Sequence, residues 1–593
     1  MRCVGGLRLP LLSFSCPFSF FFGFYPYFLI LLFLGFLVVP VDAQESNVNT
    51  SSQLAENHER LIKEGNDRIQ SELSPLLQRS DIFIQEEFQQ QPIQDKPKSD
   101  TTCFDISSVS VAGVGVFSSE VIQSITNRYV NRCLTLDHIN NLVAEISNLY
   151  LNNGYVTSRA YIVEQDLSDN TLDLIVLEGF IESVESKDNY LSDRQLLLAF
   201  PVSLSEKLNI RDLEQGLENL NRLGQNNVTL AMEPGLQQGG TVVGIQNQLQ
   251  SRWRGSIGIN NTGVESTGEY QADANLIYEN LFGINDSLIA TVSSNVGGHE
   301  LPVSNSRSYS LVASLPAGYW QFGLSNSYFE YEQSVLGSEV NFLTHGTSFN
   351  STLSADYTFY RDQAEKMQFS LAFTRKESRN FIEDVFLETS SRTLYVWDAA
   401  VTYVHHYPVG SLDATFHINK SVPWWDAKRE LAVAEDDFQF TKYVADLSFT
   451  SKFSLLSHPI QMRNSLHLLY APQEILISEG VNVGGRYSVR GFSQGGLAGY
   501  RGGYLRTDFY SGLPWQLPWG LTGQLHLGID IGASNTPNFS SRKHSDWVSG
   551  AVAGFQLYYH SLSLNFTYAR ALHSPDYLGA QEQEIDFSLR LGF

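Results

Sequence analysis

Long apolar runs are scarce in this chain. After residue 43 no stretch reaches the roughly 18 consecutive apolar residues that a membrane-spanning helix needs, although 42% of the 593 residues are hydrophobic. Charged residues are also few, at 17%, whereas aromatic residues make up 12% and glycine occupies 45 positions. Many aromatic residues and glycines without a long apolar run favour β-structure over a bundle of membrane helices.

Basic residues and chemical motifs are scarce as well. The chain has 39 Lys and Arg against 63 Asp and Glu, a net charge of −24, whereas a face that binds nucleic acid needs clustered Lys and Arg. It has no Gly-rich phosphate loop followed by Lys, no His-Glu-x-x-His, no paired Cys and His at metal-binding spacing and no Gly-x-Ser-x-Gly. We therefore expect no nucleic-acid partner, no catalytic residue, no metal and no cofactor, and predict that the protein is not an enzyme.

The N-terminus carries the longest apolar run and reads as a secretory signal. Arg2 and Arg8 precede an apolar segment at 18–39, and small residues follow it up to Ala43. We predict a signal peptide at 1–43, with cleavage after Ala43. Because the apolar segment is longer than in most signals, a retained anchor helix is the alternative.

Cysteine is rare, with four residues in the chain, of which Cys3 and Cys16 would leave with the signal. The remaining pair, Cys103 and Cys133, is even in number and lies in an exported chain, which predicts a disulfide. Closing a loop of about 30 residues would stabilise the fold by ~3–4 kcal/mol. Two free buried thiols are the alternative.

Residues 44–99 are polar and rich in Gln, Glu and Ser, and we expect one helix followed by a linker. The helix is predicted at about 53–73, because a thin apolar stripe recurs there at helical spacing. The stripe comprises Leu54, Leu61, Ile62, Ile69 and Leu73. Such a narrow stripe predicts weak packing or a position in a polar cavity.

Residues 100–251 alternate strand-like and helix-like patterns. In the first unit, 100–178, a strand-like segment is followed by two helical segments and two more strand-like segments. Residues 179–251 repeat this β-α-α-β-β order, so two copies of one small α+β unit lie in tandem. An edge strand in each unit would offer unpaired backbone groups to an incoming chain.

From residue 252 to 593 the helical signal disappears. Segments of about 10–14 residues alternate polar and apolar side chains between turn residues, as strands of a membrane β-barrel do. The last segment places one apolar set on one face: Ile585, Phe587, Leu589, Leu591 and Phe593. We count about 16 candidate antiparallel strands, with a long gap between the eleventh and the twelfth. A soluble β-sandwich would also alternate, but the aromatic residues at strand ends favour membrane interfaces.

The long gap, residues 475–500, is rich in glycine but also carries apolar side chains, which predicts a loop folded into the lumen. Arg490 would need an anion there. Two strands later, period 2 places Gly528, Asp530 and Gly532 on the lumen face. We predict that a bidentate Arg490–Asp530 pair locks the loop to the wall; in the alternative, Arg490 is solvated and Asp530 is an ordinary wall residue. Two further lumen residues are expected to extend the network, Asp508 and Arg506.

Together these features resemble the TpsB transporters of two-partner secretion, the haemolysin-activator (ShlB/FhaC) type within the BamA-like barrel superfamily. They include the tandem units, the Gly-Ile-Asp-Ile-Gly strand, the terminal Phe593 and a Val-Arg-Gly-Phe loop motif made of Val489, Arg490, Gly491 and Phe492. The resemblance covers nearly the whole mature chain. It implies two periplasmic POTRA domains, a 16-stranded outer-membrane barrel of a Gram-negative bacterium, and a plug role for the helix at about 53–73.

The resemblance also implies partners and a mechanism. A TpsA-type secreted exoprotein, such as an adhesin, a haemolysin or a contact-inhibition toxin, would dock on the POTRA domains and thread through the pore without nucleotide. Outer-membrane lipid would surround the barrel, and the barrel-assembly machinery would read Phe593 during insertion. The alternative is a BamA-like assembly factor, although such proteins usually carry more periplasmic repeats. A passive porin would have no use for docking domains.

Overall fold

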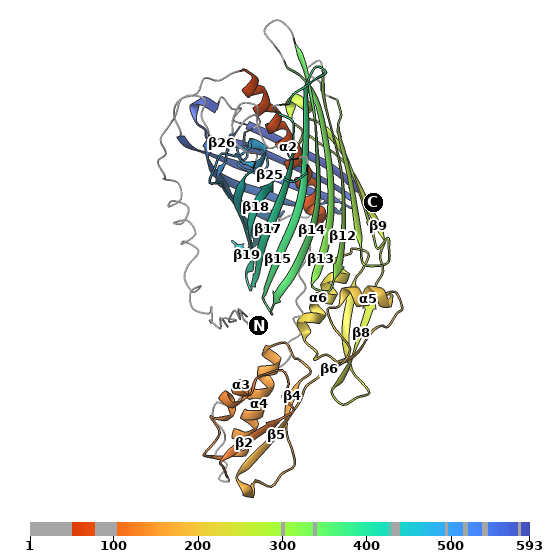
Figure 1. The fold of residues 1–593 in the computed structure, drawn as a ribbon, viewed down its shortest axis with the longest axis vertical. Coiled ribbons are helices and arrows are strands. Elements are labelled where there is room, and N and C mark those ends of the chain that lie inside the picture. The colour runs from red at the N-terminus through yellow and green to blue at the C-terminus, as the bar shows by residue number, and fades with distance from the viewer. Residues whose placement is uncertain are drawn as a thin grey trace, which may run out of the picture.

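The computed structural model describes residues 50–77 and 103–593, apart from internal stretches at 298–302, 336–340, 389, 426, 428–438, 493–495, 514–519, 537–543 and 579–582. Two small α+β domains extend from one end of a β-barrel, and a long helix lies within the barrel (Figure 1). The predicted signal peptide, its cleavage site and residues 78–99 of the predicted linker lie outside the described residues.

Sixteen antiparallel strands close the barrel, as the sequence predicts. In chain order they are β9 (Trp253–Asn260), β10 (Gln271–Glu279), β11 (Ser287–Asn295), β12 (Ser304–Ala317), β13 (Trp320–Val335), β14 (Phe342–Arg361), β15 (Glu365–Ile382), β17 (Arg392–Tyr407), β18 (Gly410–Val422), β19 (Thr441–Leu455), β20 (His458–Tyr470), β23 (Arg501–Gly512), β24 (Thr522–Thr536), β25 (His544–Tyr559), β26 (Leu562–His573) and β27 (Gln583–Gly592). The short β16 (Val385–Phe386) pairs with the end of β15, and β27 pairs with β9 to complete the cylinder.

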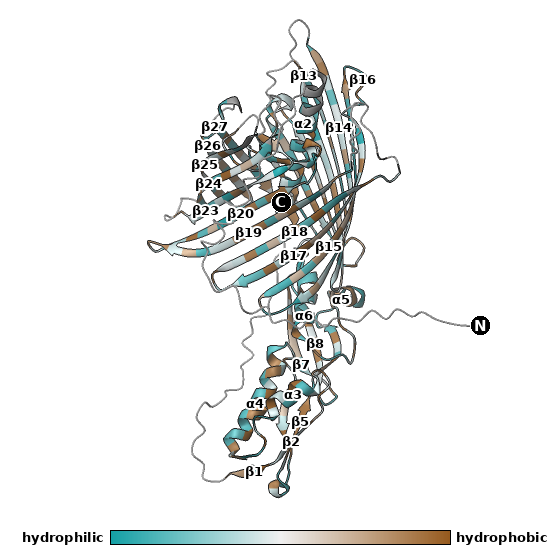
Figure 2. Cartoon of the chain, turned by 60° about the vertical axis from the view of Figure 1, so that its left-hand side comes forward, coloured by the Kyte–Doolittle hydropathy of each residue, from teal (hydrophilic) through white to brown (hydrophobic). Residues whose placement is uncertain are grey.

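Strand β24 shows why these segments form a wall with two different faces. Four apolar side chains point outwards and are 39–60% exposed: Leu525, Leu527, Ile529 and Ile531. The alternate residues face the lumen, among them the buried Asp530. Figure 2 shows the same alternation of hydrophobic and hydrophilic residues along neighbouring strands. A closed barrel of this kind satisfies its backbone hydrogen bonds between strands while the apolar side chains face lipid.

The first small domain packs two helices against a three-stranded sheet. Its sheet has the order β2 (Ser108–Ala112), β5 (Thr171–Leu177), β4 (Arg159–Ile162), with β2 parallel to β5. Helix α4 (Leu136–Asn152) contributes Leu142, Ile146 and Tyr150 to its core, and helix α3 (Ser119–Thr126) contributes Ile125. A separate pair joins β1 (Phe104–Ile106) to β3 (Arg132–Leu134), and β3 is not among the predicted elements.

A disulfide links Cys103 to Cys133 in this domain, with Cα atoms 5.3 Å apart and 30 residues of separation. Cys133 lies in β3, so the bond ties the beginning of the domain to a segment that also pairs with β1 and packs Leu134 into the core. This arrangement contains the predicted disulfide and leaves no thiol free at either position.

The second small domain has the predicted β-α-α-β-β order. Its sheet has the order β6 (Phe180–Ser186), β8 (Gly240–Asn247), β7 (Val228–Pro234), and helices α5 (Asp193–Ala199) and α6 (Ile210–Asn221) precede β7 in the chain. Leu213, Leu220 and Val243 are fully buried in its core. Single 3-10 turns lie in the connections of the chain, at η1 (Leu167–Asp169), η2 (Glu265–Thr267) and η5 (Asp576–Leu578).

The segment between β20 and β23 folds into the barrel, as predicted. It begins with the 3-10 turn η3 (Ile477–Glu479) and forms a hairpin-like pair of β21 (Val481–Val483) and β22 (Leu497–Gly499). Its apolar side chains pack against the inner wall in one buried cluster, which includes Val483, Val489, Phe492, Leu497 and Val548 of β25. Burial of these side chains explains why a glycine-rich segment is also apolar.

Helix α2 (Thr50–Leu77) lies in the lumen and is longer at both ends than the predicted 53–73. Leu61, Ile62, Ile69 and Leu73 of the predicted stripe are buried against the wall at β11, β12 and β13. Within the part of the chain that the structure describes, no helix is both long and apolar enough to cross a membrane.

Candidate functional site

Arg490 joins the inward-folded loop to the barrel wall. Its Nε and Nη2 donate to Oδ2 and Oδ1 of Asp530 on β24, each at 2.7 Å, and its backbone N–H donates to Oδ2 at 3.0 Å. Both residues are buried. One carboxylate thus accepts three hydrogen bonds from one residue, and this fixes the loop backbone as well as the side chain.

A second carboxylate completes this contact. Nη2 of Arg490 also donates to Oδ1 of Asp508 on β23 at 2.6 Å, and Nε2 of His526 on β24 lies 2.7 Å from the same oxygen. Asp508 was expected in this network on grounds of strand periodicity. His526 is not among the predicted site residues, although the same period of two places it on the lumen face.

Glycines of the wall leave the space that the loop fills. A Cβ on Gly528 would lie 2.7 Å from Nη2 of Arg490, and a Cβ on Gly550 of β25 would overlap the carbonyl oxygen of the same arginine. Gly532 lies against the side chain of Val483. The two glycines predicted on this face therefore permit close approach of the loop.

The other residues of the Val-Arg-Gly-Phe motif hold the loop tip in place. Val489 and Phe492 are buried in the cluster on the inner wall. Gly491 has a φ of +100°, which strongly favours glycine, and its missing side chain leaves room for the backbone of Arg570 and Ala571. Its N–H donates to Glu584 of β27 at 3.3 Å.

A second loop arginine, Arg486, is not among the site residues predicted from the sequence. Its Nη2 contacts Oδ1 of Asp586 and lies 3.3 Å from Oε1 of Glu584, both on β27. Its carbonyl oxygen accepts a hydrogen bond from Arg506, at 3.3 Å. The signal was present, because Asp586 falls on the predicted lumen face of the last strand.

Charged residues also hold the base of the loop. Oε1 and Oε2 of Glu479 lie 2.6 Å from Nζ of Lys376 and 2.9 Å from Nζ of Lys442, which belong to β15 and β19. Arg392 of β17 donates to Oγ of Ser478 at 2.8 Å. None of these contacts follows from strand periodicity, because each partner comes from a different strand of the wall.

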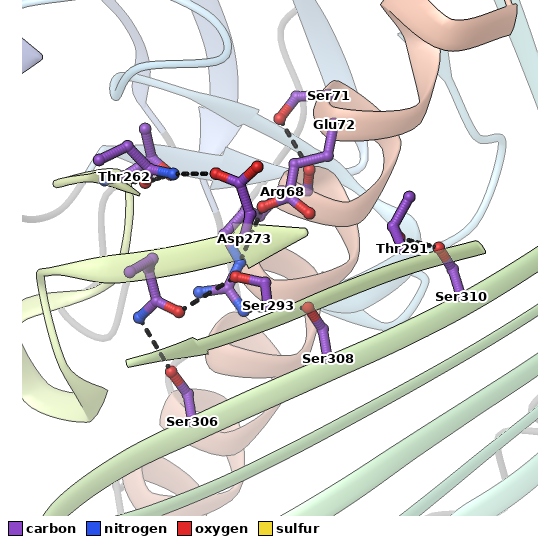
Figure 3. A network of polar contacts seen from close by, with 12 residues as sticks. Arg68, Ser71, Glu72, Thr262, Asp273, Thr291, Ser293, Ser306, Ser308 and Ser310 are labelled. Carbon is purple, nitrogen blue, oxygen red and sulfur yellow. Dashed lines mark hydrogen bonds and ion pairs between the residues drawn. The ribbon is translucent and has the colours of Figure 1, made fainter. Parts of the chain in front are cut away.

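Helix α2 contacts both the loop and the wall. Near its N-terminal end, Oε1 of Glu59 accepts a hydrogen bond from Nη1 of Arg392 at 2.7 Å. Further along, Nη2 of Arg68 lies 3.5 Å from Oγ of Ser308 on β12, and its Nε lies 3.9 Å from Glu72. Figure 3 shows Arg68 and Glu72 beside Asp273 and a group of wall serines.

The opposite sides of α2 have different surroundings. On one side, Ile69 and Leu73 pack against Phe329 of β13, and a Cβ on Gly65 would lie 2.5 Å from the Phe329 ring. On the other side lies a cavity of about 370 Å³, bounded by the helix and strands from β13 to β19. Small polar side chains are frequent in its lining, including Ser325, Ser327, Ser348, Asn350, Thr352 and Thr374. The helix therefore leaves part of the lumen polar and open.

The second small domain is held to the near end of the barrel by buried ion pairs. Arg361, the last residue of β14, lies 3.4 Å from Glu214 and 2.7 Å from Glu218, both on α6. Lys366 of β15 lies 2.8 Å from Glu218. These contacts orient the domain relative to the lumen.

A protonatable contact lies in the same joint. Asp212 of α6 accepts a hydrogen bond from the hydroxyl of Tyr319, in the turn between β12 and β13. Burial raises the pKa of Asp212 from 3.8 to about 6, and the hydrogen bond from Tyr319 offsets only part of this rise.

The chain terminus lies at the seam that closes the barrel. Phe593 exchanges two backbone hydrogen bonds with Gly255, both at 2.9 Å, and its ring lies 6.1 Å from that of Trp253 on β9. Its side chain is exposed on the barrel. In the folded protein, Phe593 thus contributes to closure.

Comparison with known proteins identifies the family. Residues 239–557 match the model of haemolysin secretion/activation protein ShlB/FhaC/HecB, residues 104–179 match the ShlB-type POTRA domain, and residues 180–234 match a further POTRA model. Outer membrane transporter CdiB of Dickeya dadantii is 31% identical over 70% of this chain and 74% of that protein. This chain belongs to the ShlB/FhaC/HecB family.

Other similar proteins support the same family and the same fold for this ShlB/FhaC/HecB protein. Hemolysin transporter protein ShlB of Serratia marcescens is 30% identical over 76% of this chain and 78% of its own length. The structure of CdiB from Escherichia coli shares the fold, with a TM-score of 0.79 and 24% identity over 93% of this chain and 100% of that chain. The predicted TpsB resemblance, fold class and class of function are confirmed: the protein is an outer-membrane transporter of two-partner secretion in a Gram-negative bacterium, and not an enzyme.

Proposed function

We propose that this transporter exports a large, unfolded TpsA-type exoprotein from the periplasm to the cell surface through the lumen that α2 occupies. The relatives are named for transport of haemolysin or as CdiB transporters, so adhesins, haemolysins and contact-inhibition toxins are the client classes to test. The observation that carries the proposal is the position of α2 inside a 16-stranded barrel, beside a cavity lined mainly by small polar and charged side chains.

The lining suits an extended chain of varied sequence. Hydroxyl and amide side chains such as Ser348, Asn350 and Thr374 can donate to or accept from the backbone of a passing polypeptide. They offer no deep apolar site where a client would stop. Passage requires α2 to leave, because the helix fills the space between the cavity and the wall at β12 and β13.

Docking on the POTRA domains is the first step of the proposed route. Edge strands such as β4 and β7 each have one partner in their sheets, so their outer backbone groups can pair with an added client strand. Such pairing gives affinity from main-chain hydrogen bonds and demands little of the client sequence. The ion pairs between α6 and the barrel would keep the docked client close to the entrance of the pore.

The Arg490–Asp530 pair serves in this proposal as the lock that keeps the loop tip against the wall while the client passes. Folding of the client outside supplies the work, because gains of even ~0.05–0.15 kcal/mol per residue amount to tens of kcal/mol over hundreds of residues. Phe593 is proposed as the signal that the barrel-assembly machinery reads before the seam closes.

Deletion of the gene, with co-expression of a large exported protein encoded beside it, tests the function. We expect the client to be lost from the cell surface and to accumulate in the periplasm, while the abundance of other outer-membrane barrels stays unchanged. Restoring the gene should restore surface exposure. A fall in many unrelated barrels, with normal client export, would instead favour a BamA-like assembly factor.

A further inference from the structure

The first POTRA domain gathers its positive charge in one place. Residues 103–178 contain nine Asp and Glu but only three Lys and Arg, which are Arg128, Arg132 and Arg159, so the net charge is −6. Two of these arginines line one cavity of about 230 Å³, together with His138, the only histidine in this range. The cavity is therefore a basic site on an acidic domain.

Only one of the two arginines in the cavity is paired with an acid. Nη2 of Arg128 lies 2.6 Å from Oε2 of Glu145 on α4, and the hydroxyl of Tyr129 donates to Oε1 of the same carboxylate at 2.9 Å. Arg132, the first residue of β3, is exposed, and no hydrogen bond or ion pair of its side chain is found in the part of the chain that the structure describes. Its guanidinium therefore keeps its N–H donors for a ligand.

His138 supplies a further donor to the cavity. The backbone N–H of Thr135 donates to its Nδ1 at 3.2 Å, within the capping box that begins α4. Because Nδ1 accepts this hydrogen bond, the proton of the neutral ring lies on Nε2. No hydrogen bond of Nε2 is found among the described residues. The helix cap thus holds the imidazole at the cavity with one N–H ready to donate.

A strand edge lies along the same cavity. All three residues of β3, Arg132–Leu134, line it. β3 pairs with β1 in a two-stranded sheet, so the outer backbone groups of β3 have no strand partner among the described residues. The disulfide to Cys103 fixes the middle residue of β3, and Leu134 is buried in the core. The edge is thus held in place before a ligand arrives, which lowers the entropic cost of binding.

We propose that an acidic, extended segment of the exported client binds in this cavity, an inference that rests on the export function proposed above. The client backbone adds to the outer edge of β3, and Arg132 and His138 bind a carboxylate that the segment carries. A peptide carboxylate is favoured over a free anion, because only a peptide can also pair with the strand edge. Figure 2 places β1, the partner of β3, towards the end of the domain that is farthest from the barrel. An arriving client can therefore reach the cavity before it reaches the pore.

Another edge strand of the same domain, β4, has acidic residues beside it. The connection that follows β4 carries Glu164, Asp166 and Asp169, and Asp173 is exposed on the neighbouring strand β5. An acidic segment would meet like charges there, which costs binding free energy. The basic cavity therefore also determines which strand edge such a segment uses.

The test uses the purified full-length protein in detergent micelles and two fluorescent heptapeptides, one of alternating Thr and Glu and one of alternating Thr and Gln. Fluorescence anisotropy measures their binding. The double variant is Arg132→Gln with His138→Gln, because glutamine at this position can keep the capping box of α4. The matched control is Arg194→Gln: Arg194 of α5 is likewise exposed, with no side-chain partner among the described residues. Hydrogen exchange of α4 checks that the first POTRA domain is folded.

We expect the wild type and Arg194→Gln to bind the Thr-Glu peptide about tenfold more tightly than the Thr-Gln peptide, and the double variant to lose this preference while α4 stays protected. Free glutamate should compete far more weakly than the peptide. Equal binding of the two peptides by the wild type would overturn the acidic specificity, and equal competition by glutamate would overturn the assignment to an extended chain.

Export of the client separates this inference from the proposed function. We expect the double variant to slow the appearance of the client at the cell surface and Arg194→Gln to leave it unchanged. Normal export by the double variant would overturn the role of the cavity and leave the proposed function intact. Normal export after deletion of the whole gene would overturn the proposed function itself.

Discussion

The loop tip and helix α2 share one lumen but are held there by different contacts. At the loop tip, the guanidinium of Arg490 is enclosed between Asp530 and Asp508, and the loop backbone itself is hydrogen-bonded to the wall. In the helix, Nε of Arg68 and Oε1 of Glu72 are buried without a hydrogen-bond partner among the described residues. The helix also borders a cavity of about 370 Å³ along one side.

This difference separates a fixed part of the lumen from a removable one. Opening a buried, fully bonded ion pair leaves charges without partners, which costs about 3–5 kcal/mol. Apart from the 2.7 Å contact of Glu59 with Arg392, the helix would exchange long or incomplete polar contacts for water, which a polar lumen supplies. We therefore expect α2 to be the part that leaves during transport and the loop tip to be the part that stays.

The largest effect is expected from Arg490→Ala. The variant leaves Asp530 and Asp508 buried without their cation, so we expect a loss of about 3–5 kcal/mol of barrel stability and a loss of client export. Barrel stability is measured by the denaturant midpoint of the heat-modifiable band, and export by surface labelling of the client. Asp530→Ala, the other half of the pair, should behave in the same way.

A matched control is Arg463→Ala. Arg463 of β20 is the register partner of Asp508, so it carries the same charge on the same face of the wall, but no hydrogen bond or ion pair of its side chain is found among the described residues. We expect near-normal export and stability from this control. Normal export by both Arg490→Ala and Asp530→Ala would remove the lock from the mechanism.

Gly550→Ala tests the lock without removing a charge. The added Cβ would overlap the backbone carbonyl oxygen of Arg490, and neither atom can rotate away because the backbone fixes both positions. Overpacking of this kind costs about 1–3 kcal/mol, and we expect a value near the upper end together with reduced export. The control is Gly512→Ala, where a Cβ would meet nothing within 4 Å. Equal stability of the two variants would show that the loop tip adjusts easily.

The sequence predicts the contact between the loop tip and the wall, because this contact depends on short-range periodicity. Alternation along β24 predicts that Asp530 faces the lumen, and the glycine-rich gap predicts the loop that carries Arg490. The pairing of these two residues then follows from charge. The strand count and the tandem domains follow from the same two periods, of 2 and about 3.6 residues.

The remainder depends on contacts between distant segments, which local patterns do not determine. Glu59 meets Arg392 across 333 residues, and Glu479 meets Lys376 across 103. A thin apolar stripe predicts that α2 lies in a polar cavity, but not which wall it faces. That choice depends on Phe329 and the missing side chain of Gly65, and neither residue has a periodic signal of its own.

Gly65→Leu applies a steric change to the helix that resembles Gly550→Ala at the lock. The new side chain would collide with the Phe329 ring. We expect α2 to leave the lumen more often as a result, because releasing the helix costs less free energy than releasing the loop tip. Overpacking by about 1–2 kcal/mol would raise the open population about 5- to 30-fold, with the barrel still folded. Single-channel conductance in planar bilayers measures this population.

The control for this variant is Gln70→Leu, because Gln70 is exposed to the cavity on the other side of the helix. The same leucine should fit there and leave the conductance close to that of the wild type. If Gly65→Leu destabilised the barrel without opening it, the distinction between a fixed loop and a removable helix would be wrong.

Asp212, in the contact between the second POTRA domain and the barrel, tests how a buried carboxylate behaves without a cation beside it. Its hydrogen bond comes from a neutral phenol, whereas that of Asp530 comes from a guanidinium. Its docked pKa is raised from 3.8 to about 6 by burial, so the docked state binds the proton more tightly than the undocked state. The stabilisation of the joint is complete below pH 3.8 and is lost as the pH rises through about 6.

Between pH 5 and 7 we expect docking to weaken by about 1 kcal/mol. Hydrogen exchange of α6 at matched intrinsic rates measures this change. Asp212→Asn should dock tightly at both pH values, whereas an unchanged pH slope in that variant would assign the effect to other groups of the joint.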